Sequence, residues 1–488
     1  MRFKTRQAPA NKSPDDFIRR FFHAAVIANT FLYIDGGQFS YMQDGSPVYD
    51  WASNTLSLDM SKDWTNSTVS FGSIDKPSGA PSLFGGSLSY YAPNNVIYSG
   101  LAGRPDDYEN DFNGTYPNPP NLWALKPDNQ GGGTWSQILD SDAPVLKSVT
   151  RPVDAAIAAG PRETWFLGGG GLDGSSLANM LQFDMENQQF NNVTTKFDSV
   201  WHGKLDYVPV YGTDGILIAF PGDSRYGLID FSTVEVYDVT TQAWYNQTTT
   251  GDLPIPRKDH CVTGVASSQQ TYEIFVYGGF RGDLGNETIL VVGGGDPAAT
   301  TADKADYTSQ TEKAQISTKD PNKQGLGIFD MTTLQWNDRY SASASAYKQA
   351  EQVKTFYDAA GDSYKQGLLP EISSLMQKAH FDHVTNSTST STTSAKSDSK
   401  TTNKGAIAGG VVGGIAALAL IIGVKRLLRR RRQRRNNVAE KDALPLKPED
   451  QAYMSELHNT QRPHEMDSRP MHEVDGNSNQ PNMMVELQ

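Results

Sequence analysis

Residues 163–173 read ETWFLGGGGLD, and residues 179–190 read NMLQFDMENQQF. The first segment is a short run of strand-forming residues that ends in glycines, where the chain turns with backbone angles that other residues rarely adopt. The second segment mixes apolar and polar residues and closes on an aromatic residue. This pair of segments predicts antiparallel strands joined by a polar loop, with the closing aromatic covering a core between neighbouring sheets.

The same order of features recurs along residues 15–345. The glycine-ended run is also found as TFLYIDGGQF (30–39), NVIYSGLAGR (95–104), GILIAFPGDS (215–224), YEIFVYGGFRGD (272–283) and TILVVGGGDP (288–297). The second run closes at Trp64, Trp135, Phe190, Trp244 and Trp336. Copies two to four begin roughly 50–70 residues apart, a spacing that suits a four-stranded antiparallel sheet with its loops.

These segments resemble the Kelch-repeat β-propeller. The diglycines that carry the resemblance are Gly36–Gly37, Gly168–Gly169, Gly278–Gly279 and Gly293–Gly294, and the repeat tryptophans are Trp64, Trp135, Trp244 and Trp336. The resemblance implies an all-β fold, with a propeller of about six blades over residues 15–345. Helical spacing in 348–357 and 369–379 predicts a helical or irregular extension over 346–384 that docks on the side of the propeller.

One interval breaks the pattern. The diglycines at Gly278 and Gly293 are only 15 residues apart, which leaves no room for the outer strands of one blade and the inner strands of the next. We therefore expect an incomplete fifth blade, with either an open strand edge or a merged blade. The polar residues 296–324 are expected to form a loop.

The C-terminal part differs in composition. Residues 385–404 are a Ser/Thr-rich segment, expected to be a disordered stalk, either O-glycosylated or unmodified. Residues 405–424 carry no charge and would span roughly 30 Å as a helix, and eight of the eleven residues that follow are basic. This predicts one transmembrane helix, followed over 425–488 by a basic cluster and a disordered cytosolic tail. The whole arrangement resembles a fungal Kelch-repeat membrane protein.

Glycines spaced four apart in the predicted span, such as Gly405, Gly409 and Gly413, would let two helices approach closely. Either this face forms a homodimer, or the span is simply rich in small residues. The propeller is expected to be extracytoplasmic, which its Asn-x-Ser/Thr sites favour. No signal peptide with a cleavage site is evident near the N-terminus, and the alternative is therefore a propeller that faces the cytosol. Candidate N-glycosylation sites are Asn66, Asn113, Asn192, Asn246 and Asn286.

Charge and cysteine content exclude several classes of protein. The chain has 488 residues, 43 basic and 55 acidic, for a net charge of −12. Residues 425–488 hold 12 basic and 10 acidic residues, so the preceding part carries −14, which argues against nucleic-acid binding. A single cysteine, Cys261, allows no internal disulfide, four-cysteine zinc site or CxxC redox pair.

No catalytic, cofactor-binding or metal-binding residue is predicted. Cys261 is better explained as a small residue on a strand than as a nucleophile paired with His260. A galactose-oxidase-like copper enzyme is the enzymatic alternative, because it shares the propeller architecture, but it needs a cysteine–tyrosine cross-link and two histidines. The expected function is therefore binding of a protein or a glycan. Candidate ligand-binding residues lie in two predicted loops, 38–51 and 104–116: Tyr41, Tyr49, Trp51, Arg104, Asp106 and Tyr108.

Overall fold

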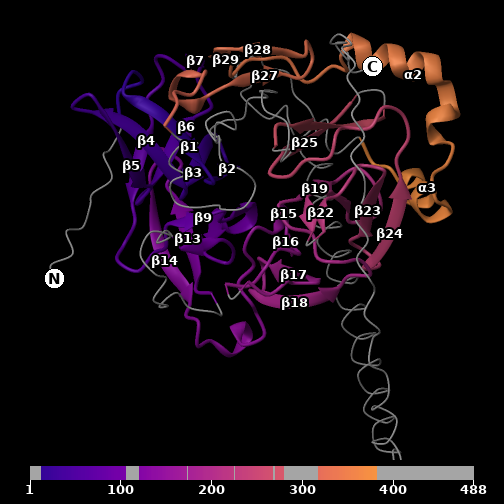
Figure 1. Ribbon diagram of the computed structural model, residues 1–488, viewed down its shortest axis with the longest axis horizontal. Helices are drawn as coiled ribbons and strands as arrows, with labels where there is room; N and C mark the ends of the chain where they lie inside the picture. Colours follow the sequence, from indigo (N-terminus) through magenta and orange to yellow (C-terminus); the bar gives the residue numbers. More distant parts are fainter. Residues whose placement is uncertain are drawn as a thin grey trace, which may run out of the picture. The chain divides into compact units, whose positions relative to one another are not determined.

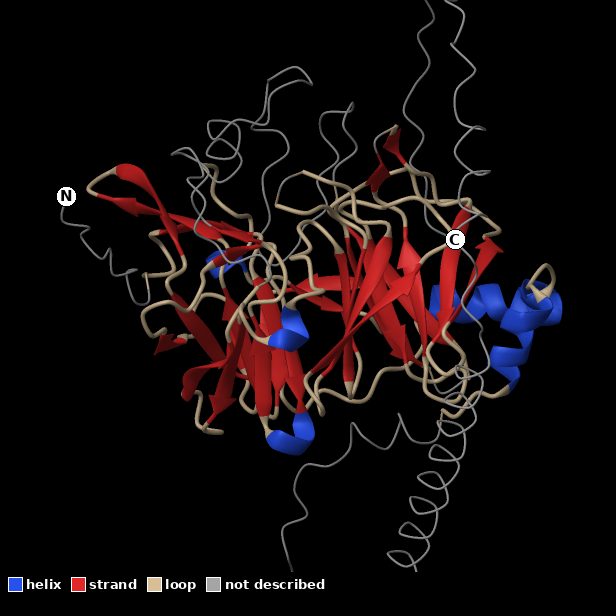
Figure 2. Cartoon of the chain, turned by 90° about the horizontal axis from the view of Figure 1, so that it is seen from below, coloured by secondary structure: helices blue, strands red, loops and turns tan. Residues whose placement is uncertain are grey.

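The computed structural model describes residues 12–105, 120–172, 174–224, 226–267, 270–279 and 317–381, all of which belong to one compact unit. Strands predominate in this part of the chain, and its helices are few and short (Figure 2). The all-β fold class is therefore confirmed.

Four antiparallel sheets, each of four strands in sequential order, follow one another along the chain (Figure 1). Sheet 1 contains β2 (Ala24–Ala28), β3 (Phe31–Asp35), β6 (Asn54–Asp59) and β8 (Gly72–Asp75). Sheet 2 contains β10 (Leu88–Tyr91), β11 (Val96–Ser99), β13 (Leu122–Pro127) and β14 (Gly133–Leu139). Sheet 3 contains β15 (Ala156–Ala159), β16 (Glu163–Leu167), β17 (Asn179–Asp184) and β18 (Gln189–Thr194). Sheet 4 contains β19 (Lys204–Val208), β20 (Ile216–Phe220), β23 (Thr233–Asp238) and β24 (Ala243–Thr248).

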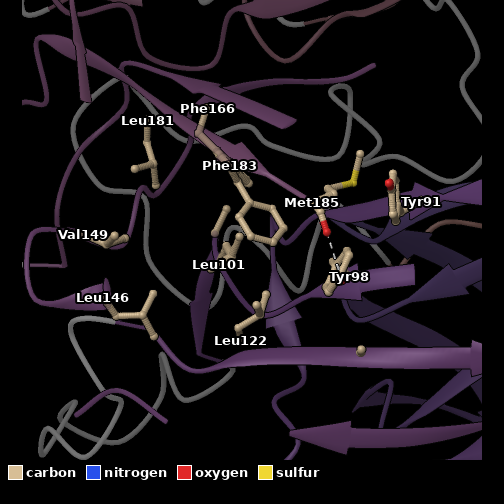
Figure 3. Close-up of a cluster of buried hydrophobic side chains, with 12 residues drawn as sticks. Tyr91, Tyr98, Leu101, Leu122, Leu146, Val149, Phe166, Leu181, Phe183 and Met185 are labelled. Atoms are coloured by element: carbon tan, nitrogen blue, oxygen red, sulfur yellow. Dashed lines mark hydrogen bonds between the residues drawn. The ribbon is translucent and has the colours of Figure 1, made fainter. Parts of the chain in front are cut away.

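The cores lie between successive sheets. Between sheets 2 and 3, Phe183 and Leu122 are fully buried, and the Tyr98 hydroxyl donates a hydrogen bond of 3.2 Å to the Met185 carbonyl (Figure 3). Similar clusters join sheets 1 and 2, sheets 3 and 4, and sheet 4 and the strands that follow it. Since each sheet covers one face of the next, the hydrophobic effect stabilises the series rather than any single sheet.

Two repeat tryptophans lie where the sequence pattern predicts. Trp135 on β14 and Trp244 on β24 are each 7% exposed and belong to cores between adjacent sheets. The Trp135 indole also donates a hydrogen bond of 3.1 Å to the Thr55 hydroxyl of sheet 1. The closing aromatic residue thus ties its own sheet to the preceding one.

For the other two tryptophans, the prediction that they cover a core between adjacent sheets is wrong. Trp64 lies in β7 (Trp64–Thr65), outside sheet 1, because this strand pairs with β29 (Arg339–Tyr340) and the indole stacks on Tyr340 at 5.1 Å. Trp336 is 44% exposed, since its hairpin of β27 (Ile328–Asp330) and β28 (Gln335–Asn337) pairs with no other strand in the described part of the chain.

Sheet 5 has two strands among the described residues, β25 (Cys261–Ala266) and β26 (Tyr272–Tyr277). Residues 280–316, which include the Gly293–Gly294 diglycine, lie outside the described residues, so the incomplete fifth blade stays a prediction. The β27–β28 hairpin contacts β26 through aromatic pairs, Phe275 with Phe329 at 6.2 Å and Tyr277 with Trp336 at 5.1 Å.

Residues 317–342 connect sheet 5 back to sheet 1. The Asn66 amide donates a hydrogen bond of 3.0 Å to the Leu326 carbonyl, and the Asp320 amide donates one of 2.8 Å to the Ile18 carbonyl. The short helix η4 (Lys323–Gly325) lies in this segment, so the predicted loop over 296–324 is partly ordered where it is described. Residues 317–342 therefore contact β1 and the segment between β6 and β8.

The predicted loop over 38–51 is wrong. It is a hairpin of β4 (Gln38–Gln43) and β5 (Ser46–Trp51), which pairs with β1 (Phe17–Phe21) in a three-stranded sheet. The two residues of its turn, Asp44 and Gly45, have φ of +53° and +77°, as a tight hairpin turn requires.

The remaining elements are small. Two further two-stranded sheets pair β9 (Leu83–Phe84) with β12 (Arg104–Pro105), and β21 (Asp223–Ser224) with β22 (Gly227–Leu228). Short 3-10 helices are η1 (Ala92–Asn94), η2 (Pro144–Leu146) and η5 (Gly361–Lys365). The α-helices among the described residues are α2 (Glu351–Ala360) and α3 (Pro370–Gln377), which overlap the segments 348–357 and 369–379. Helix α3 buries Ile372 and Leu375 against sheet 4.

The described helices include none with the length and apolar character needed to cross a membrane. The predicted stalk, span and tail, residues 385–488, lie outside the described residues.

The diglycines of sheets 1 and 3 contact the backbone of neighbouring segments closely. Gly168 and Gly169 have φ of +66° and +73°, and the Gly169 amide donates a hydrogen bond of 2.8 Å to the Val200 carbonyl ahead of sheet 4. A Cβ on Gly169 would lie 2.2 Å from the Val153 carbonyl oxygen, ahead of its own sheet. Gly37 is placed in the same way, with its amide 2.9 Å from the Leu83 carbonyl. Glycine is thus required for both conformation and space.

We predict that Gly169→Ala lowers the free energy of unfolding by at least about 2 kcal/mol more than Gly174→Ala, because overpacking adds to backbone strain. Gly174 is the matched control, since its φ is +77° but a Cβ added there would meet no atom within 4 Å. Urea unfolding followed by tryptophan fluorescence measures both losses. Equal losses would show that the close approach of the backbones is not needed.

Candidate functional site

Five residues at one end of the sheets share a left-handed backbone conformation, each just ahead of the first strand of its sheet. We call them the turn set: Phe22, Gly85, Asp154, His202 and Asp259, with φ of +53°, +66°, +55°, +55° and +56°. Such angles are uncommon outside glycine and cluster at functional sites.

Backbone hydrogen bonds link the members of the turn set. The Gly85 amide donates to the Phe22 carbonyl, the His202 amide to the Asp154 carbonyl and the Asp259 amide to the His202 carbonyl, each at 2.9 Å. A Cβ on Gly85 would lie 3.9 Å from the Asp154 carboxylate. Consecutive sheets therefore bring these side chains together, although 50 or more residues separate many of them along the chain.

A charged network spans sheets 3, 4 and 5 at this end. His202 Nδ1 lies 2.8 Å from one Asp223 oxygen, and His202 Nε2 lies 3.5 Å from the Asp154 carboxylate. Lys258 Nζ lies 2.9 Å from the other Asp223 oxygen. These four side chains are 14–21% exposed, so they are largely shielded yet accessible from solvent.

Contacts within the network set the protonation states of His202, Asp154 and Asp223. Burial lowers the pKa of His202, but its bonds to Asp154 and Asp223 outweigh burial and raise the pKa to about 10. Burial raises the pKa of both carboxyls, but His202 outweighs burial there too and holds them below their ordinary value. His202 is therefore a cation at neutral pH, held between two carboxylates.

Three of the candidate ligand-binding residues meet in one aromatic cluster beside the turn set. Phe84 stacks on Phe22 at 3.9 Å and meets Trp51 edge-on at 6.3 Å, and Tyr49 packs in the same cluster. The Arg104 guanidinium lies 4.2 Å from the centre of the Phe84 ring. The charge of Arg104 also acts on Asp154, so the cluster adjoins the charged network.

The other candidates are not brought there. Tyr41 is 4% exposed and stacks on Phe39 in a separate small core, where it cannot meet a ligand. Asp106 and Tyr108 lie outside the described residues.

The candidate N-glycosylation sites differ in exposure. Asn66 is 7% exposed and its amide is bonded within the fold, so it is a poor acceptor for a glycan. Asn192 and Asn246 are exposed, whereas Asn113 and Asn286 lie outside the described residues.

The cysteine is not activated. Burial raises the pKa of the Cys261 thiol, the reverse of what a nucleophile needs, and burial lowers the pKa of the fully buried His260 to about 3. Among the described residues, no group of three or more His, Cys, Asp or Glu side chains is placed to hold a metal ion.

Sequence reasoning missed the charged network. His202 follows Trp201 in a stretch with no motif, and Asp154, Asp223 and Lys258 lie in three other segments. A usable signal existed in the alignment of the repeats, because all four residues lie just before a first strand or just after a second one.

No protein-family model matches the chain. A curated protein, "Kelch repeat-containing protein" from Arthroderma benhamiae (strain ATCC MYA-4681 / CBS 112371), is 22% identical over 419 residues, which cover 72% of this chain and 62% of that protein. This chain thus spans less than two thirds of its relative's length. Among solved structures, "Structure of YjhT" is similar with a TM-score of 0.34 and 12% identity, over 52% of this chain and 71% of that one.

We predict that His202→Gln lowers the free energy of unfolding by about 3 kcal/mol at pH 7, because two partly buried carboxylates lose their shared cation. The pKa of His202 is raised on folding, so its contribution is complete below the ordinary histidine pKa and is lost as pH rises through about 10. The gap between wild type and variant should therefore narrow from pH 7 to pH 10 in chemical unfolding.

The matched control is Lys62→Ala, which removes the exposed Lys62–Asp59 pair and should cost less than about 1 kcal/mol. A gap between wild type and His202→Gln that stays constant or widens over this pH range would contradict the assigned protonation.

Proposed function

We propose that this chain is a Kelch-type β-propeller of about six blades that acts as a non-enzymatic binding protein for a protein or a glycan. The proposal is supported by similarity to a Kelch repeat-containing protein over 72% of the chain. It is also supported by four four-stranded antiparallel sheets in series, and by diglycines that follow the second strand in sheets 1, 3 and 5.

The observation that carries the proposal is that an aromatic surface and a charged surface adjoin at the end of the sheets where the turn set lies, which we call the turn-set end. Aromatic side chains with an arginine lie on one side, and the network around His202 lies on the other. Partly exposed aromatic residues beside fixed charges are typical of recognition surfaces. The side chains come from segments that are far apart in the sequence, from Phe22 to Lys258, so the folded chain is needed to assemble them.

We further propose that residues 405–424 anchor the chain in a membrane, with the propeller extracytoplasmic, the tail cytosolic and a homodimer formed through the Gly-x3-Gly face. The support is the uncharged run of 20 residues followed by a cluster of basic residues. A cytosolic propeller at a membrane is the alternative.

A propeller oxidase is a second candidate, favoured by one observation. Cys261 and Tyr277 lie directly opposite each other on β25 and β26, as a cysteine–tyrosine cross-link would need. Purified full-length protein that contains stoichiometric copper and oxidises primary alcohols would establish the enzyme and overturn the non-enzymatic proposal.

We predict that Trp51→Ala weakens ligand binding at least about tenfold, as expected for an aromatic residue central to an interface. Full-length protein in detergent would be tested against a glycan array and a panel of secreted proteins, with affinities measured for the ligands retained. Phe356→Ala on α2 is the control, because Phe356 is an exposed aromatic residue that lies outside the cluster. Unchanged affinity in a folded Trp51→Ala variant would reject this surface.

We predict that the protein expressed in a glycosylating eukaryotic host loses mass on N-glycosidase treatment. Asn192→Gln and Asn246→Gln should each remove one glycan, whereas Asn66→Gln should remove none, because that side chain is buried and hydrogen-bonded. A complete absence of mass loss would favour the cytosolic alternative.

A further inference from the structure

Asp259 differs from the other acidic residues of the turn-set end. Its backbone amide bonds to the His202 carbonyl, but within the described part of the chain its carboxyl has no hydrogen-bond partner. Asp154 and Asp223, in contrast, are both held by His202. A half-buried carboxyl without a partner is costly unless water or a ligand supplies one.

The charges around Asp259 are nearly balanced. His202, Lys204 and Lys258 attract its carboxylate, whereas Asp154 repels it, and burial raises its pKa above the ordinary value. The cations His202 and Lys258 are already paired with carboxylates. The Asp259 carboxyl, which has no hydrogen-bond partner among the described residues, is therefore surrounded by fixed charges of both signs.

This balance discriminates between ligands. A cationic ligand at Asp259 would meet the positive charges of His202, Lys204 and Lys258, and an anionic ligand would meet the carboxyls of Asp259 and Asp154. A neutral ligand that carries several hydroxyl groups meets neither penalty, since each hydroxyl both donates to a carboxylate and accepts from a cation. The partly buried rings of Phe22 and Trp51 offer an apolar surface for the C–H faces of such a ligand.

We infer that the turn-set end binds a neutral saccharide and that the Asp259 carboxyl accepts hydrogen bonds from its hydroxyl groups. The inference rests on the proposed binding function and narrows it to one chemical class. Asp259 acts as a binding residue, and His202 is a positioning residue that holds the Asp259 backbone and the neighbouring carboxylates.

The test uses the full-length protein on an array of neutral oligosaccharides, uronic-acid and sulfated oligosaccharides, and glucosamine oligomers with free amines. Titration calorimetry with the neutral oligosaccharide that is retained best then compares wild type with three variants. Asp259→Ala should weaken binding at least about tenfold, and Asp259→Asn only a few-fold, because an amide retains a hydrogen-bond acceptor. Asp252→Ala, an exposed aspartate in the same connecting segment, should leave affinity unchanged.

Retention of only anionic or only amine-bearing sugars would overturn the inference, and so would wild-type affinity in a folded Asp259→Ala variant. An equal loss in Asp259→Asn and Asp259→Ala would also overturn it, because it would show that the negative charge itself is recognised. Failure of the inference remains distinct from failure of the proposed function: a ligand from the protein panel whose binding depends on Trp51, with no saccharide retained, would leave the binding function standing and reject the saccharide.

Discussion

The fold depends on the close approach of three backbone segments at each diglycine. In sheets 1 and 3 the second strand ends on two glycines with positive φ, and the second glycine contacts the segment ahead of its own sheet and hydrogen-bonds to the segment ahead of the next. Any side chain there would occupy the space of a carbonyl group. Because this contact sets where each first strand begins, it also sets where Asp154, His202 and Asp259 lie.

The same constraint explains how a binding surface arises from a repeat. Each sheet adds one residue to the turn set, and the backbone geometry at that place is constant while the side chain varies. Sheets 3 to 5 contribute charged residues there, whereas sheet 1 contributes Phe22 beside the aromatic cluster. The scaffold therefore fixes position and leaves chemistry to single residues, which is how unrelated functions come to share one fold.

The fold class and the four-stranded antiparallel sheets 2 to 4 were accessible from the sequence, because glycine-ended runs and closing aromatics report contacts within and between neighbouring sheets. The hairpin at 38–51 carried its own signal, Asp44–Gly45 between alternating apolar residues, and the aromatic and acidic residues around it obscured that signal. The displacement of Trp64 was inaccessible, since it depends on pairing with Arg339–Tyr340, more than 270 residues away. The charged network has no local motif, and only the shared place of its residues beside the first or second strand of a repeat could have pointed to it.

The net charge of the chain is a poor guide to the charge at the candidate site. The part of the chain before residue 425 carries a charge of −14, which would suggest a cationic ligand if the charge were spread evenly. At the turn-set end, however, His202, Lys258 and Arg104 lie among three aspartates, so the local balance is close to neutral. Charge at long range influences the approach of a ligand, whereas short-range pairing and unsatisfied groups decide what can stay bound. The acidic surface therefore bears on association rate, and the unpartnered carboxyl of Asp259 bears on specificity.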